Sequence, residues 1–165
     1  MRKFTRLSIL LSLSVILNTI ESFIPLPIGI KLGLANVVTL FVLYQYSFKD
    51  ALYINVLRVF LTGILRTGLF SVTFFFSLSG ALLSVIMMYL SKKITKLSIV
   101  GISIIGSIFH SIGQVIIAIF ILQMNTMIYY LPYLLLFSIP TGIIVGITCK
   151  QLIKYYSDTL TEFEF

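Results

Sequence analysis

The sequence predicts an all-α membrane protein with six transmembrane helices, and three observations support this prediction. Apolar residues make up 59% of the 165 residues, charged residues make up only 10%, and the mean hydropathy is +1.11. Soluble domains, in contrast, carry about 25% charged residues. The apolar residues form long segments, and most lysine and arginine residues lie between these segments. The formal charge of +7 is therefore assigned to membrane topology and not to a nucleic-acid surface.

Six apolar segments approach the length of roughly 20 residues that a helix needs to cross a hydrocarbon core. We expect helices near residues 5–24, 33–48, 50–66, 68–91, 97–123 and 127–153, in a single integral membrane domain (1–165) that ends in a short cytoplasmic tail (156–165). The last three helices are the clearest, because no acidic residue interrupts them.

The first three segments are less regular. Asn18 and Glu21 interrupt the first segment, and Arg58 lies in the middle of the third. Only two charged residues separate the second segment from the third. An ionisable side chain at membrane depth costs roughly 2.5–3.5 kcal/mol on insertion scales. The alternative is therefore a four- or five-span protein in which residues 33–66 are partly re-entrant.

The connections between the segments carry an uneven charge. With the N-terminus inside, nine basic residues fall on the cytoplasmic side: Arg2, Lys3, Arg6, Lys49, Lys92, Lys93, Lys96, Lys150 and Lys154. Lys31 and Arg66 fall on the outer side. Because cytoplasmic loops carry the excess of lysine and arginine, we expect a multi-pass protein of the cell membrane with both termini in the cytoplasm.

Polar residues recur at helical spacing in three of the segments. Residues three or four positions apart share one face of a helix, because successive residues are 100° apart. The three polar faces consist of Ser14, Asn18, Glu21 and Ser22 in the first segment, Asn55, Arg58, Thr62 and Arg66 in the third, and Ser103, Ser107, His110 and Gln114 in the fifth. Lipid cannot satisfy such faces, so we expect them to point into the bundle.

In the six-span topology these polar faces lie from mid-membrane outward, and a Pro- and Gly-rich connection is interpreted as a cover over them. The pattern predicts an outward-facing pocket for an anionic or amphiphilic small molecule, lined by Asn18, Glu21, Lys31, Asn36, Arg58, Arg66, His110 and Gln114. The alternative is a packing network in which Glu21 neutralises Arg58 or Arg66. In that network His110 bonds to Ser107 or to a carbonyl group.

A separate stripe of small polar residues follows the first segment on the side away from Asn18. It includes Thr5, Ser8 and Ser12, which lie three and four positions apart. Small residues allow two helices to approach closely. This stripe is therefore the candidate surface for docking a partner protein.

Several kinds of catalytic centre are excluded by residues that the sequence lacks. There is no phosphate-cradling glycine loop followed by Lys and Ser or Thr, so this chain does not itself use ATP. The two aspartates, Asp50 and Asp158, cannot form the paired aspartate-rich motifs that hold magnesium on a diphosphate. Cys149 is the single cysteine, which excludes a thiolate metal site within the chain. We expect no catalytic residue, no bound metal and no cofactor in this chain.

Four parts of the sequence resemble the Gx transporter family, which is also named heptaprenyl diphosphate synthase component I. They are the run Pro-Leu-Pro-Ile-Gly-Ile-Lys-Leu-Gly-Leu-Ala-Asn and its continuation (Pro25–Leu40), Leu57–Val59, Phe76–Ala81 and Phe109–Gln114. The resemblance covers about residues 5–155. It implies a compact six-helix bundle similar to the substrate-binding S components of energy-coupling factor transporters.

The same resemblance implies a function and partners. An S component captures a vitamin-like solute and docks on a transmembrane T component with two ATPases, which use ATP. Its docking surface typically has alanines four apart on the first helix, where this chain has Ser8 and Ser12. We therefore expect the substrate-binding subunit of an uptake transporter. The alternative is a non-catalytic membrane subunit associated with heptaprenyl diphosphate or quinone synthesis, because a synthase would need the missing aspartates.

Overall fold

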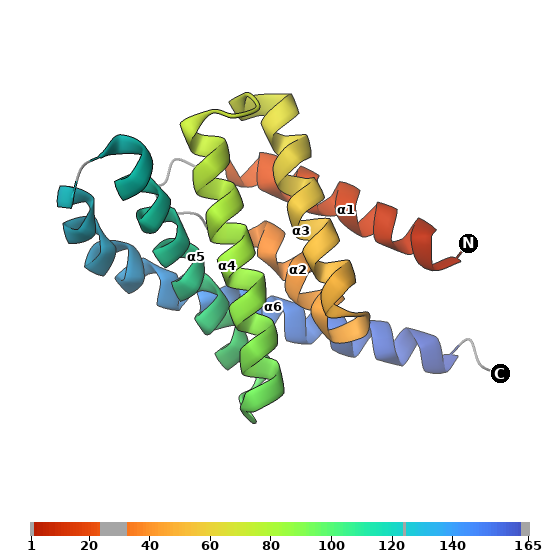
Figure 1. Ribbon diagram of the computed structural model, residues 1–165. Helices are drawn as coiled ribbons and strands as arrows, with labels where there is room; N and C mark the ends of the chain where they lie inside the picture. Colours follow the sequence, from red (N-terminus) through yellow and green to blue (C-terminus); the bar gives the residue numbers. More distant parts are fainter. Residues whose placement is uncertain (1, 24–32, 124, 163–165) are drawn as a thin grey trace.

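The computed structural model describes residues 2–23, 33–123 and 125–162, and no strand occurs within them. The described residues form six α-helices, one π-helical turn (η1) and one 3-10 turn (η2), as Figure 1 shows. The bounds are α1 Arg2–Glu21, α2 Leu34–Gln45, α3 Phe48–Thr62, η1 Gly63–Thr67, α4 Val72–Ile94, α5 Ile99–Leu122, η2 Asn125–Tyr130 and α6 Leu131–Glu162. The prediction of an all-helical chain is confirmed.

Local capping residues explain why two helices begin away from the predicted positions. Helix α3 begins at Phe48 because Ser47 and Asp50 form a capping box, in which each side chain accepts a hydrogen bond from the other residue's backbone N–H. Helix α4 begins after Ser71, whose hydroxyl accepts the N–H of Phe74 at 3.2 Å. It does not begin near residue 68, because Gly68 has a φ of 81° and the helix cannot pass through that conformation.

Helix ends also differ from the prediction, since α2 ends at Gln45, three residues before the expected residue 48, and α4 ends at Ile94, three residues after the expected residue 91. Helix α1 ends at Glu21, three residues before the expected end. The α-helical part of α3 ends at Thr62, and the next five residues form the π-helix η1. Helix α6 begins at Leu131 after the 3-10 turn and continues to Glu162, into the segment that the sequence suggested as a tail.

Helix α2 is the central element of the bundle. It packs against α1, α3, α4 and α6. Two thirds of its twelve residues are buried: Ala35, Val37, Val38, Thr39, Leu40, Phe41, Val42 and Leu43. Together with residues such as Ile54, Val85 and Ile102 from other helices, these side chains form the main apolar core. A short helix with this burial is a core helix, and its residues have little access to lipid.

Glycines set the close packing of the second half of the bundle. A Cβ atom on Gly80 of α4 would lie 2.8 Å from the carbonyl oxygen of His110, and one on Gly113 of α5 would lie 2.9 Å from the carbonyl oxygen of Ser79. Gly142 and Gly146 bring α6 equally close to the backbone of α5. These glycines therefore make close contacts within one bundle.

Four helices are long and apolar enough to cross a membrane: Lys3–Glu21, Val72–Ile94, Ile99–Leu122 and Asn125–Ser157. Helix α2 is apolar but has only 12 residues, which at 1.5 Å per residue falls short of a hydrocarbon core about 30 Å thick. Six complete spans therefore remain a prediction, and the partly re-entrant alternative for residues 33–66 stays open. The start of α1 and the end of α6 lie on the same side of the molecule (Figure 1).

The predicted orientation can be tested by cysteine labelling, with a membrane-impermeant maleimide applied to intact cells. Cysteines placed at Lys96 and Ser157 are expected to react only after the cells are opened, because basic residues gather near these two positions. A cysteine placed at Asn125 is expected to react from outside. All three positions are exposed, and the native Cys149 is fully buried, so its background reaction is low. Labelling of Lys96→Cys from outside would contradict the predicted orientation.

Candidate functional site

The main cavity has a volume of about 340 Å³ and receives side chains from all six helices. Its lining includes seven of the eight residues that the sequence predicted for substrate binding: Asn18, Glu21, Asn36, Arg58, Arg66, His110 and Gln114. The eighth, Lys31, lies outside the described residues, as does most of the Pro- and Gly-rich connection predicted as a cover (residues 25–33), whose last residue, Gly33, lines the cavity. The structure thus brings together residues that are up to 96 positions apart, from Asn18 to Gln114.

Arg58 is the deepest charged group of the cavity. It is only 5% exposed, and its Nη2 atom donates to Asn55 Oδ1 at 2.6 Å and to Asn36 Oδ1 at 3.3 Å. Its Nε atom has no hydrogen-bond partner among the described residues. The two asparagines are neutral, so they orient the guanidinium without neutralising it. A buried cation is costly, and among the described residues the Glu21 carboxylate compensates that cost only from a distance, without an ion pair, so an anionic ligand would lower the cost further.

Glu21 lines the cavity as predicted, and its carboxylate also makes two hydrogen bonds that the sequence did not indicate. Its Oε1 atom accepts the backbone N–H of Gly33 at 2.6 Å, and its Oε2 atom accepts that of Leu34 at 3.1 Å. The carboxylate therefore caps the N-terminus of α2, where negative charge is favourable. Within the described part of the chain Glu21 makes no ion pair, since the ion pair found there joins Lys3 to Asp50. Glu21 therefore forms no direct ion pair with Arg58 or Arg66 there, but it attracts Arg58 as a nearby opposite charge, so the alternative in which it partly neutralises Arg58 stays open.

Arg66 lies at the edge of the cavity, in the π-helix η1. Its side chain is exposed, and its Cζ atom lies 5.8 Å from the centre of the Phe23 ring. The extra residue per turn in η1 moves Arg66 off the buried face that Asn55, Arg58 and Thr62 share on α3. Short π-helical turns of this kind often occur at functional sites. The cavity thus has one inner and one outer arginine.

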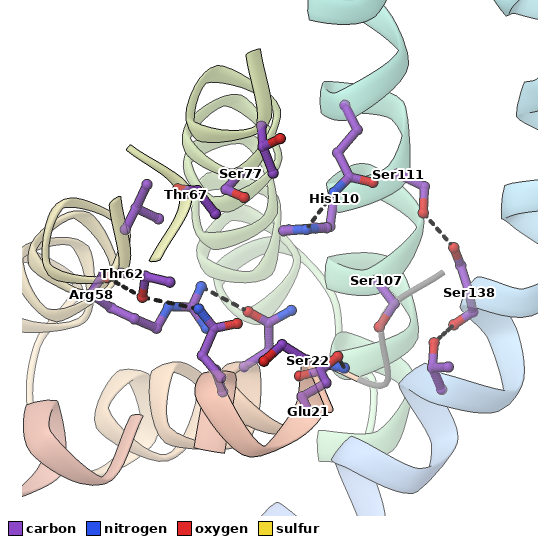
Figure 2. Close-up of a pocket in the computed structure, with 18 of the residues that line it drawn as sticks. Glu21, Ser22, Arg58, Thr62, Thr67, Ser77, Ser107, His110, Ser111 and Ser138 are labelled. Carbon is purple, nitrogen blue, oxygen red and sulfur yellow. Dashed lines mark hydrogen bonds between the residues drawn. The ribbon is translucent and has the colours of Figure 1, made fainter. Parts of the chain in front are cut away.

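The opposite wall of the cavity is neutral and rich in hydroxyl groups. The Ser111 and Ser138 hydroxyls lie 2.6 Å apart, and Thr141 donates to the Ser138 carbonyl oxygen at 3.1 Å. Figure 2 shows Arg58 on one side of the cavity, these serines on the other and His110 between them. The Nε2 atom of His110 lies 3.3 Å from Gln114 Nε2.

Sequence reasoning did not select several hydroxyl groups that line the cavity: Thr62, Thr67, Thr73, Ser77, Ser107, Ser111, Ser138 and Thr141. Some belong to the polar faces that were recognised, because Thr62 follows Arg58 by one turn and Ser107 precedes His110 by three positions. On α4 and α6 the spacing of the polar residues indicated a cavity wall less clearly. Thr73 and Ser77 are four apart and Ser138 and Thr141 three apart, and such pairs are common in helices that only pack together.

The predicted docking residues form an exposed stripe on α1. Thr5, Ser8 and Ser12 are all exposed. The Ser8 hydroxyl donates to the Phe4 carbonyl oxygen and the Ser12 hydroxyl to that of Ser8, each at 3.1 Å. Their donors are thereby satisfied within the helix, and the stripe presents a shallow surface with little bulk.

A comparison with protein-family models places these observations in context. The model described as heptaprenyl diphosphate synthase component I matches residues 10–152. The chain belongs to this family. The matched range contains every residue that lines the main cavity, from Asn18 to Thr141. Comparisons with curated proteins and with solved structures found no match.

The family description names one component of a synthase and not a complete enzyme, which agrees with the expectation that the chain is not an autonomous enzyme. Among the described residues, no three histidine, cysteine, aspartate or glutamate side chains lie together as a metal site would require. The cavity offers two guanidinium groups, a histidine, amides and hydroxyls. Such a set binds and orients a polar ligand by charge-assisted hydrogen bonds.

Proposed function

We propose that this chain is the substrate-binding membrane subunit of an uptake transporter of the energy-coupling factor type, similar to an S component. It captures a small anionic or amphiphilic solute, of the vitamin or cofactor kind, from the outer side. The observation that carries this proposal is the cavity of about 340 Å³ with Arg58 buried in its wall, where the guanidinium donates to two neutral amides and has no ion pair among the described residues. A ligand pocket of this size and enclosure suits a small molecule.

The charge distribution of the cavity supports the chemistry of the ligand. Arg58 and Arg66 lie on the α3 and η1 side, whereas Ser111, Ser138 and Thr141 supply hydroxyls on the other. The Glu21 carboxylate is occupied by the N-terminus of α2 and offsets the arginines only partly. A ligand with a carboxylate or phosphate at one end and a neutral hydrogen-bonding group at the other matches both walls.

A subunit without a nucleotide site can concentrate a solute only with an external source of energy. The proposal therefore includes a transmembrane T component and two ATPase subunits as partners, which supply the ATP-dependent step. Contact with the T component is assigned to Thr5, Ser8 and Ser12. Their exposure and their internally satisfied hydroxyls support a close helix-to-helix contact.

The test of this partnership is a double substitution of leucine for Ser8 and Ser12. Copurification of the T component and ATPases is expected to be lost while the bound solute is retained, because leucine adds bulk on the exposed face and leaves the Asn18 face unchanged. Thr148→Leu is a matched control, since the Thr148 hydroxyl also bonds to its own helix, donating to the Ile144 carbonyl oxygen at 2.9 Å. Unimpaired assembly of the double variant, or ATP-independent uptake by the chain alone in liposomes, would tell against the proposal.

A second candidate is a non-catalytic membrane subunit associated with heptaprenyl diphosphate or quinone synthesis, which the description of the family favours. The two candidates differ in what copurifies with the chain. A T component with ATPases and a small polar solute, identified by mass spectrometry, would support the transporter. A soluble aspartate-rich prenyltransferase would support the second candidate.

A further inference from the structure

A second cavity lies on the outside of the bundle, between α1 and the C-terminal part of α6, with α2 as its floor. It has a volume of about 300 Å³, and we call it the inner groove. Its lining consists of Leu10, Leu13, Val38, Phe41, Leu152, Tyr155 and Tyr156. No charged side chain lines it, so it suits a hydrocarbon chain and not the polar solute proposed for the main cavity.

One end of the inner groove carries a positive charge. The Nη1 atom of Arg6 donates to the Tyr156 hydroxyl at 3.1 Å, and the Tyr46 hydroxyl interacts with both groups. Tyr156 is held by an edge-to-face contact with Phe41, at 5.5 Å between ring centres. Arg6 is therefore fixed at the point where the apolar lining of the groove ends.

The geometry of α1 places this charge and the groove on one line. Arg6, Leu10 and Leu13 are separated by four and three residues, so they share one face of the helix. At 1.5 Å per residue, Leu10 lies about 6 Å and Leu13 about 10 Å from Arg6 along the helix axis. The groove thus extends from the Arg6 end of the bundle, where α6 also ends, toward the middle of the molecule.

Arg6 also lacks an acidic neighbour. Its side chain is exposed, and in the part of the chain that the structure describes no carboxylate lies within ion-pair distance of it. Lys3, one turn earlier, is engaged by Asp50 at 2.8 Å. A guanidinium beside two tyrosine hydroxyls is a suitable donor set for a phosphate group, because charge-assisted hydrogen bonds to phosphate are among the stronger ones.

We propose that the inner groove binds an anionic phospholipid, with its phosphate on Arg6 and Tyr156 and one acyl chain along Leu10, Leu13 and Phe41. Basic sites between helices at the cytoplasmic surface are typical sites for anionic head groups. The apolar groove behind Arg6 supplies the second half of the recognition, because its uncharged lining can pack against an acyl chain by van der Waals contact. The site is separate from the main cavity, with which it shares no lining residue.

The test uses the full-length protein, delipidated in detergent and offered equal amounts of phosphatidylglycerol and phosphatidylcholine with identical acyl chains. Native mass spectrometry is expected to find preferential retention of phosphatidylglycerol. Arg6→Gln should weaken that retention about fivefold, as expected for the loss of one basic group at a membrane surface. Arg6→Lys should keep most of the retention of phosphatidylglycerol. Leu13→Trp, which fills the groove at a half-exposed position, should lower retention of both lipids.

Lys96→Gln is the matched control, because Lys96 is exposed in the connection between α4 and α5 and does not line the groove. Thermal unfolding of each variant separates a lost site from a lost fold. Equal retention of the two lipids, or retention that Arg6→Gln leaves unchanged in a folded protein, would overturn the proposal. Displacement of phosphatidylglycerol by farnesyl diphosphate at equal concentration would overturn it in favour of a prenyl diphosphate site.

Discussion

Replacement of Arg58 by methionine is expected to lower the retention of the native solute by about 10- to 100-fold, since a hydrogen bond to a charged group contributes about 1.5–3 kcal/mol. Methionine keeps much of the length of the side chain and removes its charge and donors. The fold is expected to persist, because Asn55 keeps its bond to the Ala81 carbonyl oxygen at 2.7 Å. The measurement is quantitative mass spectrometry of the solute that copurifies with the wild type and with the variant.

The control for this experiment is Lys154→Met, which removes an exposed positive charge from α6 far along the chain from the cavity residues. It should leave solute retention unchanged. Thermal unfolding in the same detergent shows whether Arg58→Met remains folded. A folded Arg58→Met protein that retains the solute as the wild type does would refute the assignment of Arg58 to ligand binding.

Replacement of Glu21 by alanine is expected to destabilise the protein by about 2–4 kcal/mol, because it leaves two backbone donors at the start of α2 without their acceptor. Those donors are the N–H groups of Gly33 and Leu34. Glu21→Gln should cost less, since its amide oxygen can still accept one of the two bonds. Thermal and denaturant unfolding of the purified protein would measure both losses.

The double variant with Arg58→Met separates a helix cap from an ion pair. If Glu21 mainly caps α2, the effects of the two substitutions on stability are expected to add within about 0.5 kcal/mol. If the two side chains were each other's main partners, removing both would restore stability toward the wild type. Restoration by the double variant would therefore contradict the capping role of Glu21.

The sequence predicted the polar layer well wherever several polar residues shared a helical face. Asn55 and Arg58 on α3 are buried, and Arg58, His110 and Gln114 line the cavity as their spacing indicated. Apolar helices offer few reasons to bury such groups, so each one carries strong positional information. The last three helices were equally predictable, because uninterrupted apolar runs leave few alternatives.

What the sequence did not reveal depends on contacts between distant parts of the chain. The partners of Glu21 are backbone groups of Gly33 and Leu34, and backbone donors leave no signature in a residue pattern. The exposure of Arg66 follows from the π-helical turn, which shifts the helical register after Thr62. The helix starts at Phe48 and Val72 were in principle readable, since Ser47 and Ser71 are typical capping residues.

The burial of α2 has a consequence for permeation. Only its first turn reaches the main cavity, and beyond it Leu40 and Val42 have no exposed surface and Leu43 has 2%. Lys92 fixes the far end of this helix by donating to the Leu43 carbonyl oxygen at 2.8 Å. A close-packed apolar layer of this kind admits neither water nor ions. If the proposed function holds, we therefore expect that the isolated subunit does not leak ions, and that a solute bound in the main cavity does not cross this layer unless α2 is displaced.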